Sequence, residues 1–464
     1  MGFDPVRAEV RFGCGLSPKI LAPNSVAAVI ERLSGPDRVS EQYPISRYEN
    51  MSGEVSQIRN LASRVRQAKR RGQDVSKLLK TQQGLKQALR FRTLIWMKQS
   101  LLRCVWTEDG FRERLVHFWY DHFSAPGKTL LTRNLVAPYI ESAIRPHLTG
   151  KFGDLLLACV THPHMLDYLD QTPSMGPASD AAVKRRLRGQ SAGLNENLAR
   201  EILELHTMGV SSAYSQGDVR QLAELLTGLT GNATKGFRYL PKRAEPGSEI
   251  IMQRIYGADG GLSDIENAMQ DIAMEPATAV HISRKLAVHF ITDLPSPSLV
   301  NAMSARYLET QGDLLRTYTA MLEHPDAWFE GRANYKRPVA FITSAMRALA
   351  VSEEIFDDWG RQLFYTNLAK PLQLMGQEWL RPGGPDGWEE EDGHWMSPQG
   401  LAARLQWSLA VPSVLVDSLP DPRRFVTSAL GTSARPQTVY AVNAAQTRRE
   451  GLALALMSPE FQRH

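Results

Sequence analysis

The chain has 464 residues, of which 43% are hydrophobic and 22% are charged, and its formal net charge is +5. This composition is close to that of an average globular protein and excludes disordered, collagen-like and fibrous classes. No stretch approaches the roughly 18 consecutive apolar residues of a transmembrane helix, so we expect no membrane span.

The N-terminus and the cysteines bear on the compartment. The first residues, MGFDPVRAEVRFG, lack the basic segment and the apolar segment of a secretory signal. Cys14, Cys104 and Cys159 are too scattered for a metal cluster and too few for a disulfide framework. We therefore expect small apolar residues in a reducing compartment, and a cytoplasmic protein unless a leader has been trimmed.

The positive charge is concentrated between residues 59 and 92. This stretch holds eleven Lys or Arg residues against one acid, Asp74, so it carries +10 while the rest of the chain sums to −5. Such a stretch suits a polyanion or a membrane surface, and it equally suits a solvated helical hairpin punctuated by Gly72 and Gly84. The hairpin is the favoured interpretation, because no nucleic-acid-binding motif and no interleaved aromatic residues accompany the charges.

Apolar residues recur with the period of an α-helix along almost the whole chain. The predicted helices cover 56–70, 85–104, 109–122, 130–144, 151–160, 163–170, 196–208, 216–227, 262–274, 277–292, 297–309, 313–323, 336–351, 352–358, 399–409, 437–446 and 449–457. Long connections are expected at 171–193 and in the Gly/Pro/Trp-rich loop at about 379–398. The prediction is an all-α protein, a single helical domain over 1–464 with a basic helical excursion at about 56–92. It has at most one short β-ribbon around 236–257, where "GFRYL" and "EIIMQRIYG" flank a turn.

The sequence "HFWYDHFS" places two histidines on the 109–122 helix. His117 and Asp121 are four residues apart and can interact, whereas His117 and His122 do not share a helical face and cannot form a compact metal pair. His122 could meet the carboxylates of another helix only through the fold. Trp119 is more simply explained as a core residue.

The stretch "GLNENLAREILELHTMGV" contains the most polar of the predicted helices. Asn195 suits the N-cap and Gly209 a left-handed stop. One arc of about 140° carries the polar residues Glu196, Asn197, Arg200, Glu201 and Glu204. A Glu196–Arg200–Glu204 ladder at this spacing is typical of a solvated helix. His206 falls on the apolar arc, so we expect it to be buried with a ring nitrogen hydrogen-bonded.

Two further segments carry candidate binding residues. His281, Lys285 and His289 recur every four residues and form a cationic stripe, which suits a phosphate, sulfate or carboxylate, or else a surface helix whose charges are balanced by acids elsewhere. Tryptophans surround an acidic loop in "WLRPGGPDGWEEEDGHW", which suits sugar stacking or, more simply, a pinned structural loop. There is no Walker loop, glycine fingerprint for dinucleotides or nucleophile elbow.

Several motifs in order resemble the bacterial domain-of-unknown-function family numbered 1800 from end to end. They are "RFGCGLSP", "FWYDHFS", "RPHLTGKFGDLLLACVTHPHMLDYLDQ", "GLNENLAREILELHTMGV", "RKLAVHFITD", "GQEWLRPGGPDGW" and "LMSPEFQRH". The resemblance implies a helical fold and a shared central site, and it supplies no established activity. Where relatives carry His-Glu-Pro-Gly this chain has Ala244, and where some have a second histidine it has Tyr120, which weakens a metal site.

Two hypotheses follow. The first is an enzyme, a hydrolase or transferase acting on a polar polymer or sugar, with Glu201, Glu204, His206 and His122 as catalytic candidates. Its candidate substrate-binding residues are Asn195, Asn197, Arg200, Trp119, Asp170, His281, Lys285 and His289. The alternative is a non-catalytic binding or assembly protein with a structural Glu/Arg network. We assign no metal or cofactor, and we expect Arg200 and a cation from another segment, Arg145 or the 281–289 stripe, to engage the glutamates.

Overall fold

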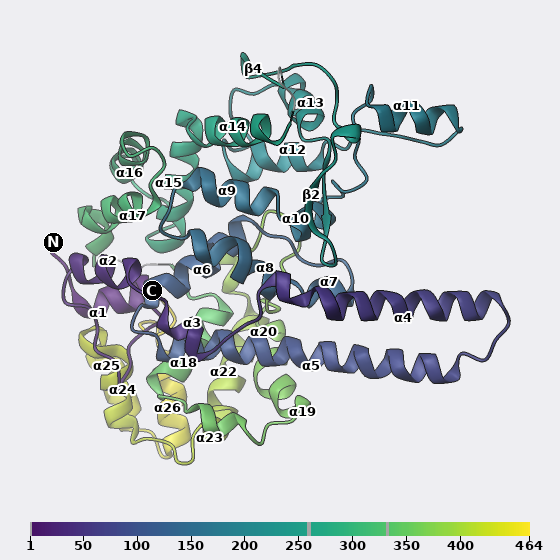
Figure 1. Ribbon diagram of the computed structural model, residues 1–464. Helices are drawn as coiled ribbons and strands as arrows, with labels where there is room; N and C mark the ends of the chain where they lie inside the picture. Colours follow the sequence, from purple (N-terminus) through teal and green to yellow (C-terminus); the bar gives the residue numbers. More distant parts are fainter. Residues whose placement is uncertain (1, 258–260, 331–333) are drawn as a thin grey trace.

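The computed structural model describes residues 2–257, 261–330 and 334–464 (Figure 1). It is built almost entirely of helices, so the all-α prediction is confirmed. Among the described residues, none of the helices combines the length and the apolar character that crossing a bilayer requires.

The elements follow one another with short connections. The N-terminal part contains α1 (Pro5–Arg7), η1 (Ala8–Phe12), α2 (Val26–Ser34), α3 (Arg38–Gln42), η2 (Tyr48–Met51), α4 (Ser52–Arg70) and α5 (Ser76–Trp106). The central part contains α6 (Gly110–His122), α7 (Leu130–Arg133), α8 (Val136–Tyr139), η3 (Ile140–Ile144), η4 (Arg145–His147), α9 (Phe152–Val160), α10 (Pro163–Tyr168), α11 (Asp180–Leu187), α12 (Asn197–Glu201), η5 (Ile202–His206), α13 (Gln216–Leu225), η6 (Pro241–Arg243), α14 (Leu262–Ala273), α15 (Pro276–Phe290), α16 (Pro297–Glu309), α17 (Leu314–Glu323) and η7 (Pro325–Trp328). The C-terminal part contains α18 (Pro338–Ala348), η8 (Glu353–Phe356), α19 (Arg361–Phe364), η9 (Tyr365–Ala369), α20 (Lys370–Leu374), α21 (Asp392–Trp395), α22 (Pro398–Ala410), α23 (Pro412–Leu415), α24 (Pro422–Leu430), η10 (Gly431–Ser433), α25 (Pro436–Asn443) and α26 (Arg448–Met457).

The described strands form two small antiparallel hairpins. β1 (Leu229–Asn232) pairs with β2 (Gly236–Tyr239), and β3 (Glu249–Ile251) pairs with β4 (Arg254–Tyr256). The two stretches that we expected to flank one turn therefore do not pair with each other: "GFRYL" pairs with the strand that precedes it, and "EIIMQRIYG" folds back on itself. Local pairing prevails because both turns are tight: Met252 and Gln253 take the positive φ values, 46° and 67°, of a two-residue hairpin turn.

Two large hydrophobic cores hold the helices together. The first is formed by α6, α8–α10 and α12–α17, and the second by the inner half of α5 together with α18–α20 and α22–α26. In Figure 1 the first core lies in the blue and teal upper half of the molecule and the second in the green and yellow lower half. The expectation of a single domain stays a prediction. The boundary between the cores is where polar side chains gather.

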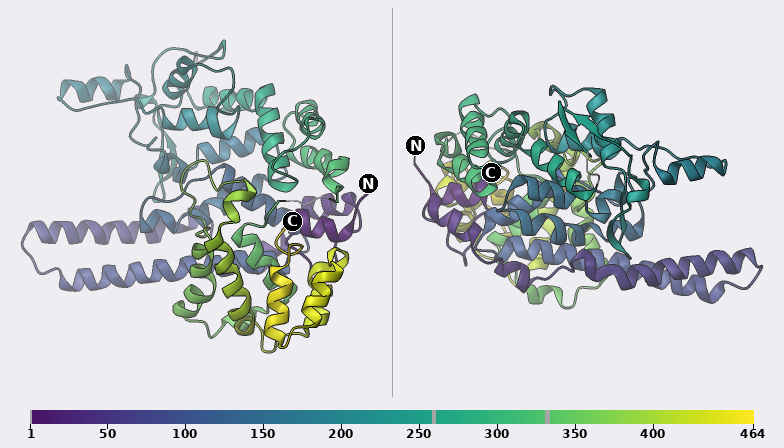
Figure 2. Two further views of the ribbon diagram at one scale, coloured as in Figure 1. Left: turned by 180° about the vertical axis from the view of Figure 1, so that it is seen from behind. Right: turned by 45° about the horizontal axis from the view of Figure 1, so that its top comes forward.

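Two elements project from the body on the same side (Figure 2). One is the antiparallel hairpin of α4 and α5, which contains the predicted basic excursion. Gly72 lies in its turn with φ +66°, but Gly84 lies inside α5, so the helix starts earlier than the expected residue 85. The other is α11, which lies within the predicted connection 171–193.

Candidate functional site

Helix α15 carries its polar stripe to the boundary between the two cores. His289 is 8% exposed, and His281 and Lys285 are partly buried, so this face of the helix is not freely solvated. The opposite face buries Ile282, Leu286 and Phe290 completely in the first core. Because both faces are covered, the stripe belongs to the interior of the molecule.

Lys285 lies between two groups of ionisable side chains. Its ammonium group makes no hydrogen bond or ion pair with any residue that the structure describes. Burial lowers its pKa, while the charges of Glu390 and Asp121 act in the opposite direction. An ammonium group partly out of water and without a direct partner is costly, so this arrangement calls for a negatively charged neighbour.

The first group consists of three imidazoles from α6, η5 and α15. The ring centroid of His122 lies 6.0 Å from that of His206 and 6.4 Å from that of His281. The Nε2 atom of His122 donates to the backbone carbonyl of His206 at 3.0 Å, because a carbonyl can only accept. Its Nδ1 is therefore a bare lone pair, and it has no partner among the described residues.

All three imidazoles are neutral near neutral pH. Burial, followed by the charge of Lys285, lowers the pKa of His206 to about 3 and that of His281 to about 4, and the pKa of His122 also falls well below its usual range. His206 is completely buried, as expected, but neither ring nitrogen has a hydrogen-bond partner in the described part of the chain, so that part of the expectation is wrong.

A π-helical turn positions His206. The helix predicted over 196–208 is α-helical only to Glu201 and continues as the π-helix η5. Such an insertion turns the following side chains away from their α-helical positions and is common at functional sites. Gly209 then ends the helix with φ +89°, as expected. A Cβ at this position would lie 2.8 Å from Nδ1 of His281, so glycine is required for the close approach of η5 to α15.

The second group is a chain of charged side chains across the boundary between the cores. Arg337, at the start of α18, forms ion pairs of 2.6 Å with both Asp121 and Glu390. Glu390 accepts a hydrogen bond from Nδ1 of His289 at 3.1 Å. The backbone N–H of Trp388 donates to the Asp121 carboxylate at 2.7 Å, and this bond holds the loop 379–398 against α6.

The environments of the two carboxylates differ. Burial raises the pKa of Asp121 although Arg337 opposes the change. Burial would also raise the pKa of Glu390, but Arg337 and His289 bring it down to about 2. Glu390 is therefore ionised and can only accept, so Nδ1 of His289 carries the proton and its Nε2 is an unpaired acceptor.

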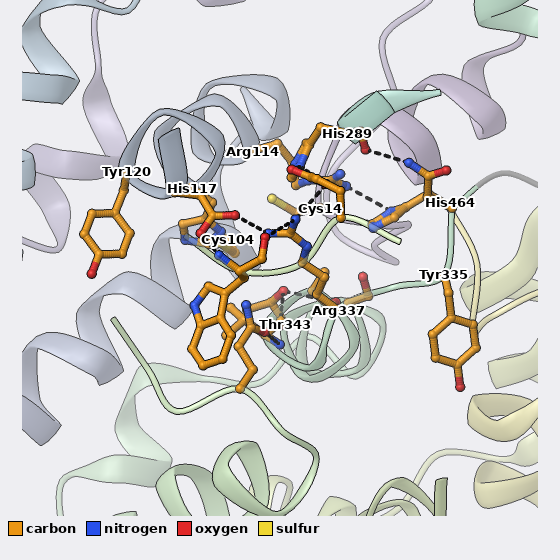
Figure 3. A pocket seen from close by; sticks show the side chains of 18 of the residues that line it. Cys14, Cys104, Arg114, His117, Tyr120, His289, Tyr335, Arg337, Thr343 and His464 are labelled. Carbon is orange, nitrogen blue, oxygen red and sulfur yellow. Dashed lines mark hydrogen bonds and ion pairs between the residues drawn. The ribbon is translucent and has the colours of Figure 1, made fainter. Parts of the chain in front are cut away.

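A cavity of about 80 Å³ lies beside this group (Figure 3). Its lining includes His117, Arg114, Arg337, Trp388 and the thiols of Cys14 and Cys104. Burial lowers the pKa of His117 to about 4, and its ring makes no hydrogen bond to a described residue. Among the described residues, no group of three or more His, Cys, Asp or Glu side chains has the arrangement of a metal site.

The ladder on α12 lies at the surface. Arg200 pairs with Glu204 at 3.1 Å and with Glu196 at 3.6 Å, with side-chain exposures of 38%, 25% and 35%. We predicted that a second cation would join this ladder, but the additional side chain is Gln216. Its amide oxygen accepts from Arg200, and its amide nitrogen donates to Glu196. Arg145 is occupied elsewhere, with Glu113 and Asp37.

Glu201 differs from its neighbours on the ladder. It is partly buried, and its carboxylate makes no hydrogen bond or ion pair with a described residue. Burial raises its pKa, assisted by the charges of Glu204 and of Asp386 in the loop 379–398. The pKa of Tyr168 is raised by burial and then by Glu201 and Asp386. The loop thus brings acidic groups toward both Glu201 and Lys285.

The remaining predicted residues have structural surroundings. Trp119 is completely buried and donates to the Tyr318 hydroxyl at 2.6 Å, which agrees with the simpler interpretation as a core residue. Asn195 accepts from the backbone of Asn197 and donates to the carbonyl oxygens of 169 and 170, which fixes the start of α12. Asn197 is exposed, and Asp170 is 61% exposed in an ion pair with Lys128.

Sequence reasoning missed the residues that join the two cores. The i, i+4 spacing of His117 and Asp121 and the acidic run in the loop 379–398 were signals for part of the site. Arg337 and Arg114 gave no local signal, because their partners lie far away in the chain: Asp121 and Glu390 for Arg337, and His464 for Arg114 at 2.9 Å.

We expect Arg200→Ala to lower the free energy of unfolding by less than about 1 kcal/mol, because partly exposed ion pairs at this spacing contribute little. Urea titration of both proteins measures the difference. A loss of several kcal/mol would contradict the surface location of the ladder.

Comparison with known proteins gives a family and no activity. The family model described as "Protein of unknown function (DUF1800)" matches residues 7–463. No curated protein and no solved structure matches the chain. The match covers both cores, the polar stripe of α15 and the charged chain around Arg337, and by this near-complete coverage the protein belongs to the DUF1800 family.

Proposed function

We propose that the protein is an enzyme, a hydrolase or a transferase, whose substrate is a sugar or a unit of a polar polymer that carries an anionic group. The observation that supports this most directly is Lys285. Its ammonium group lies partly buried among ionisable side chains and has no direct partner among the described residues. A carboxylate, phosphate or sulfate of the substrate would supply the missing negative charge.

Two of the proposed groups can move protons. Glu201 makes no hydrogen bond or ion pair with a described residue, and burial raises its pKa, which suits a general acid or base. His122 offers a neutral Nδ1 lone pair near Lys285, and His206 can orient a polar group. In this proposal Lys285 binds the anion, and Glu201 transfers the proton.

The proposal predicts that Lys285→Met separates binding from stability. Anionic sugars such as glucuronate and glucose 6-phosphate should raise the melting temperature of the native protein and should lose this effect in the variant. The free energy of unfolding of the Lys285→Met variant should be lower than that of the native protein by no more than about 1 kcal/mol. The loss is small because the substitution removes a partly buried charge that has no direct partner. Calorimetry with each sugar measures both quantities.

Arg284→Met is the matched control, because Arg284 is the exposed neighbour on the same helix and the change in charge is identical. Glu201→Gln, tested with chromogenic glycoside, phosphate and sulfate substrates, tests the acid/base role. If Arg284→Met abolishes the ligand effect as completely as Lys285→Met, the anion site is not at Lys285.

The second candidate is a non-catalytic assembly protein. It is favoured by the chain Asp121–Arg337–Glu390–His289, which joins the two cores. Both carboxylates of this chain have partners. Under this alternative no anionic sugar stabilises the protein, and Glu201→Gln changes no turnover of any substrate.

A further inference from the structure

The two projections of the fold both end in basic residues. The hairpin tip, which we define as residues 69–80, contains Lys69, Arg70, Arg71, Lys77 and Lys80. All five side chains are exposed, and none forms a hydrogen bond or an ion pair with a described residue. Asp74 is the single acid in this segment, and it is bonded to Ser76. No positive charge at the tip is therefore neutralised by an ion pair within the described structure.

Helix α11 repeats the pattern on a smaller scale. The α11 tip, which we define as residues 184–188, contains Lys184, Arg185, Arg186 and Arg188, all exposed and without a described partner. The helix is attached to the body near its N-terminus, where Ala178 N–H donates to Glu245 at 2.9 Å. Its C-terminal end is therefore the free end.

Apolar side chains accompany the charges at both tips. Leu187 is 83% exposed, and Val183, one helical turn before it, is 42% exposed. Leu79 at the hairpin tip is 38% exposed. A partner that is bound only through its phosphate groups would not require exposed apolar side chains at the tips. A basic helix with leucine on its free face is typical of segments that bind at the interface of an anionic bilayer.

The arrangement of the two tips is also suited to a flat surface. All three views in Figures 1 and 2 show the hairpin and α11 leaving the body on the same side, with the hairpin reaching farther out than α11. A planar surface could touch both tips at once, and two weak contacts made together bind far more tightly than either alone.

We propose that the hairpin tip and the α11 tip together form a docking surface for an anionic lipid bilayer. The basic residues of both tips lie against the lipid headgroups, and Leu187 and Leu79 enter the interface. This inference is independent of the site at Lys285.

Co-sedimentation with vesicles tests the proposal. The intact protein should bind vesicles of phosphatidylcholine with phosphatidylserine at low ionic strength, should release as salt is raised, and should not bind phosphatidylcholine alone. Replacing Lys184, Arg185, Arg186 and Arg188 by glutamine should weaken binding at least tenfold. Leu187→Ser should weaken binding several-fold while leaving its salt dependence unchanged.

The matched control removes the same charge from another place. Arg361, Arg423, Arg424 and Arg449 are exposed and lie in the C-terminal part of the chain, and their replacement by glutamine should leave vesicle binding within twofold. The thermal melt of each variant confirms that it is folded. The proposal is overturned if the control weakens binding as much as the tip variant, or if intact protein ignores anionic vesicles. It is also overturned if the protein binds duplex DNA more tightly than the vesicles, with no effect of Leu187→Ser.

Discussion

Lowering the pH from 6.5 toward 4 is expected to unfold the protein, because many of its histidines are buried in the neutral form. Burial, as the first cause in each case, lowers the pKa of His206 to about 3 and lowers to about 4 the pKa values of His117, His164, His281 and His289. The pKa values of His122, His162 and His464 also lie well below 6.5. The unfolded chain binds a proton at each of these positions near pH 6.5 and the folded protein does not.

The sign of the effect follows from proton linkage. Each such histidine contributes stability that is present above its unfolded pKa and is lost as the pH falls toward its folded pKa, at up to about 1.4 kcal/mol per pH unit. Six described carboxyl groups oppose this loss, because burial raises their pKa values. The pKa reaches about 6 for Asp109 and about 7 for Glu249, and it is also raised for Glu9, Asp121, Glu201 and Asp293. The histidines outnumber them, and folded proteins have only about 5–15 kcal/mol of stability to lose. The histidines therefore decide the direction.

Urea titrations at successive pH values measure this loss, and His206→Leu sharpens the test. The variant should lose stability less steeply below pH 6.5, by about one proton or about 1.4 kcal/mol per pH unit. It should be no less stable than the native protein at neutral pH, because both ring nitrogens of His206 lack partners. His394→Gln, at an exposed position, should leave the slope unchanged. Identical slopes for His206→Leu and the native protein would show that His206 does not titrate as a buried group.

The features that the sequence predicted well depend on neighbours along the chain. The helical period places α15, the ladder spacing pairs Arg200 with Glu196 and Glu204, and glycine ends the helix at Gly209. Each of these follows from residues within one or two turns of one another. The single domain, the enzyme and the substrate contacts stay predictions.

The features that sequence reasoning missed arise from contacts between distant segments. Arg337 meets Asp121 across 216 positions of the chain, and each of the two residues taken alone is typical of a solvated surface. The π-helix η5 has no periodic signature, since a period of 3.6 residues predicts an α-helix through His206. For the same reason Trp119, which we included among substrate contacts, is fixed in the core by Tyr318, a partner almost 200 positions away.

Arg337→Met is expected to lower the free energy of unfolding by about 3–5 kcal/mol, because it leaves the buried carboxylate of Asp121 and the largely buried carboxylate of Glu390 without their shared cation. The side chains of Arg337, Asp121 and Glu390 are 13%, 8% and 23% exposed, so water replaces little of the lost ion pairs. Glu390 would keep His289, a neutral donor, as its direct partner. Urea titration at neutral pH measures the loss.

Two further variants separate the ion pairs from general damage to the fold. Arg381→Met removes an ion pair with Glu378 in which both side chains are more than 40% exposed, and it should change stability by less than about 1 kcal/mol. Combining Arg337→Met with Asp121→Asn and Glu390→Gln removes the charges together, and it should recover most of the loss.

The cost of Arg337→Met should also shrink as the pH is lowered, because protonation of Asp121 and Glu390 then neutralises the unpaired charges in the folded protein. In the native protein Glu390 stays ionised over this pH range, because Arg337 and His289 hold its pKa at about 2 against the effect of burial. The difference between native and variant stability, measured above pH 4, therefore reports on the two carboxylates that Arg337 pairs. A difference that stays constant with pH would mean that Arg337 stabilises the fold by packing, as its position 5.8 Å from the Trp395 ring allows, and not by its charge.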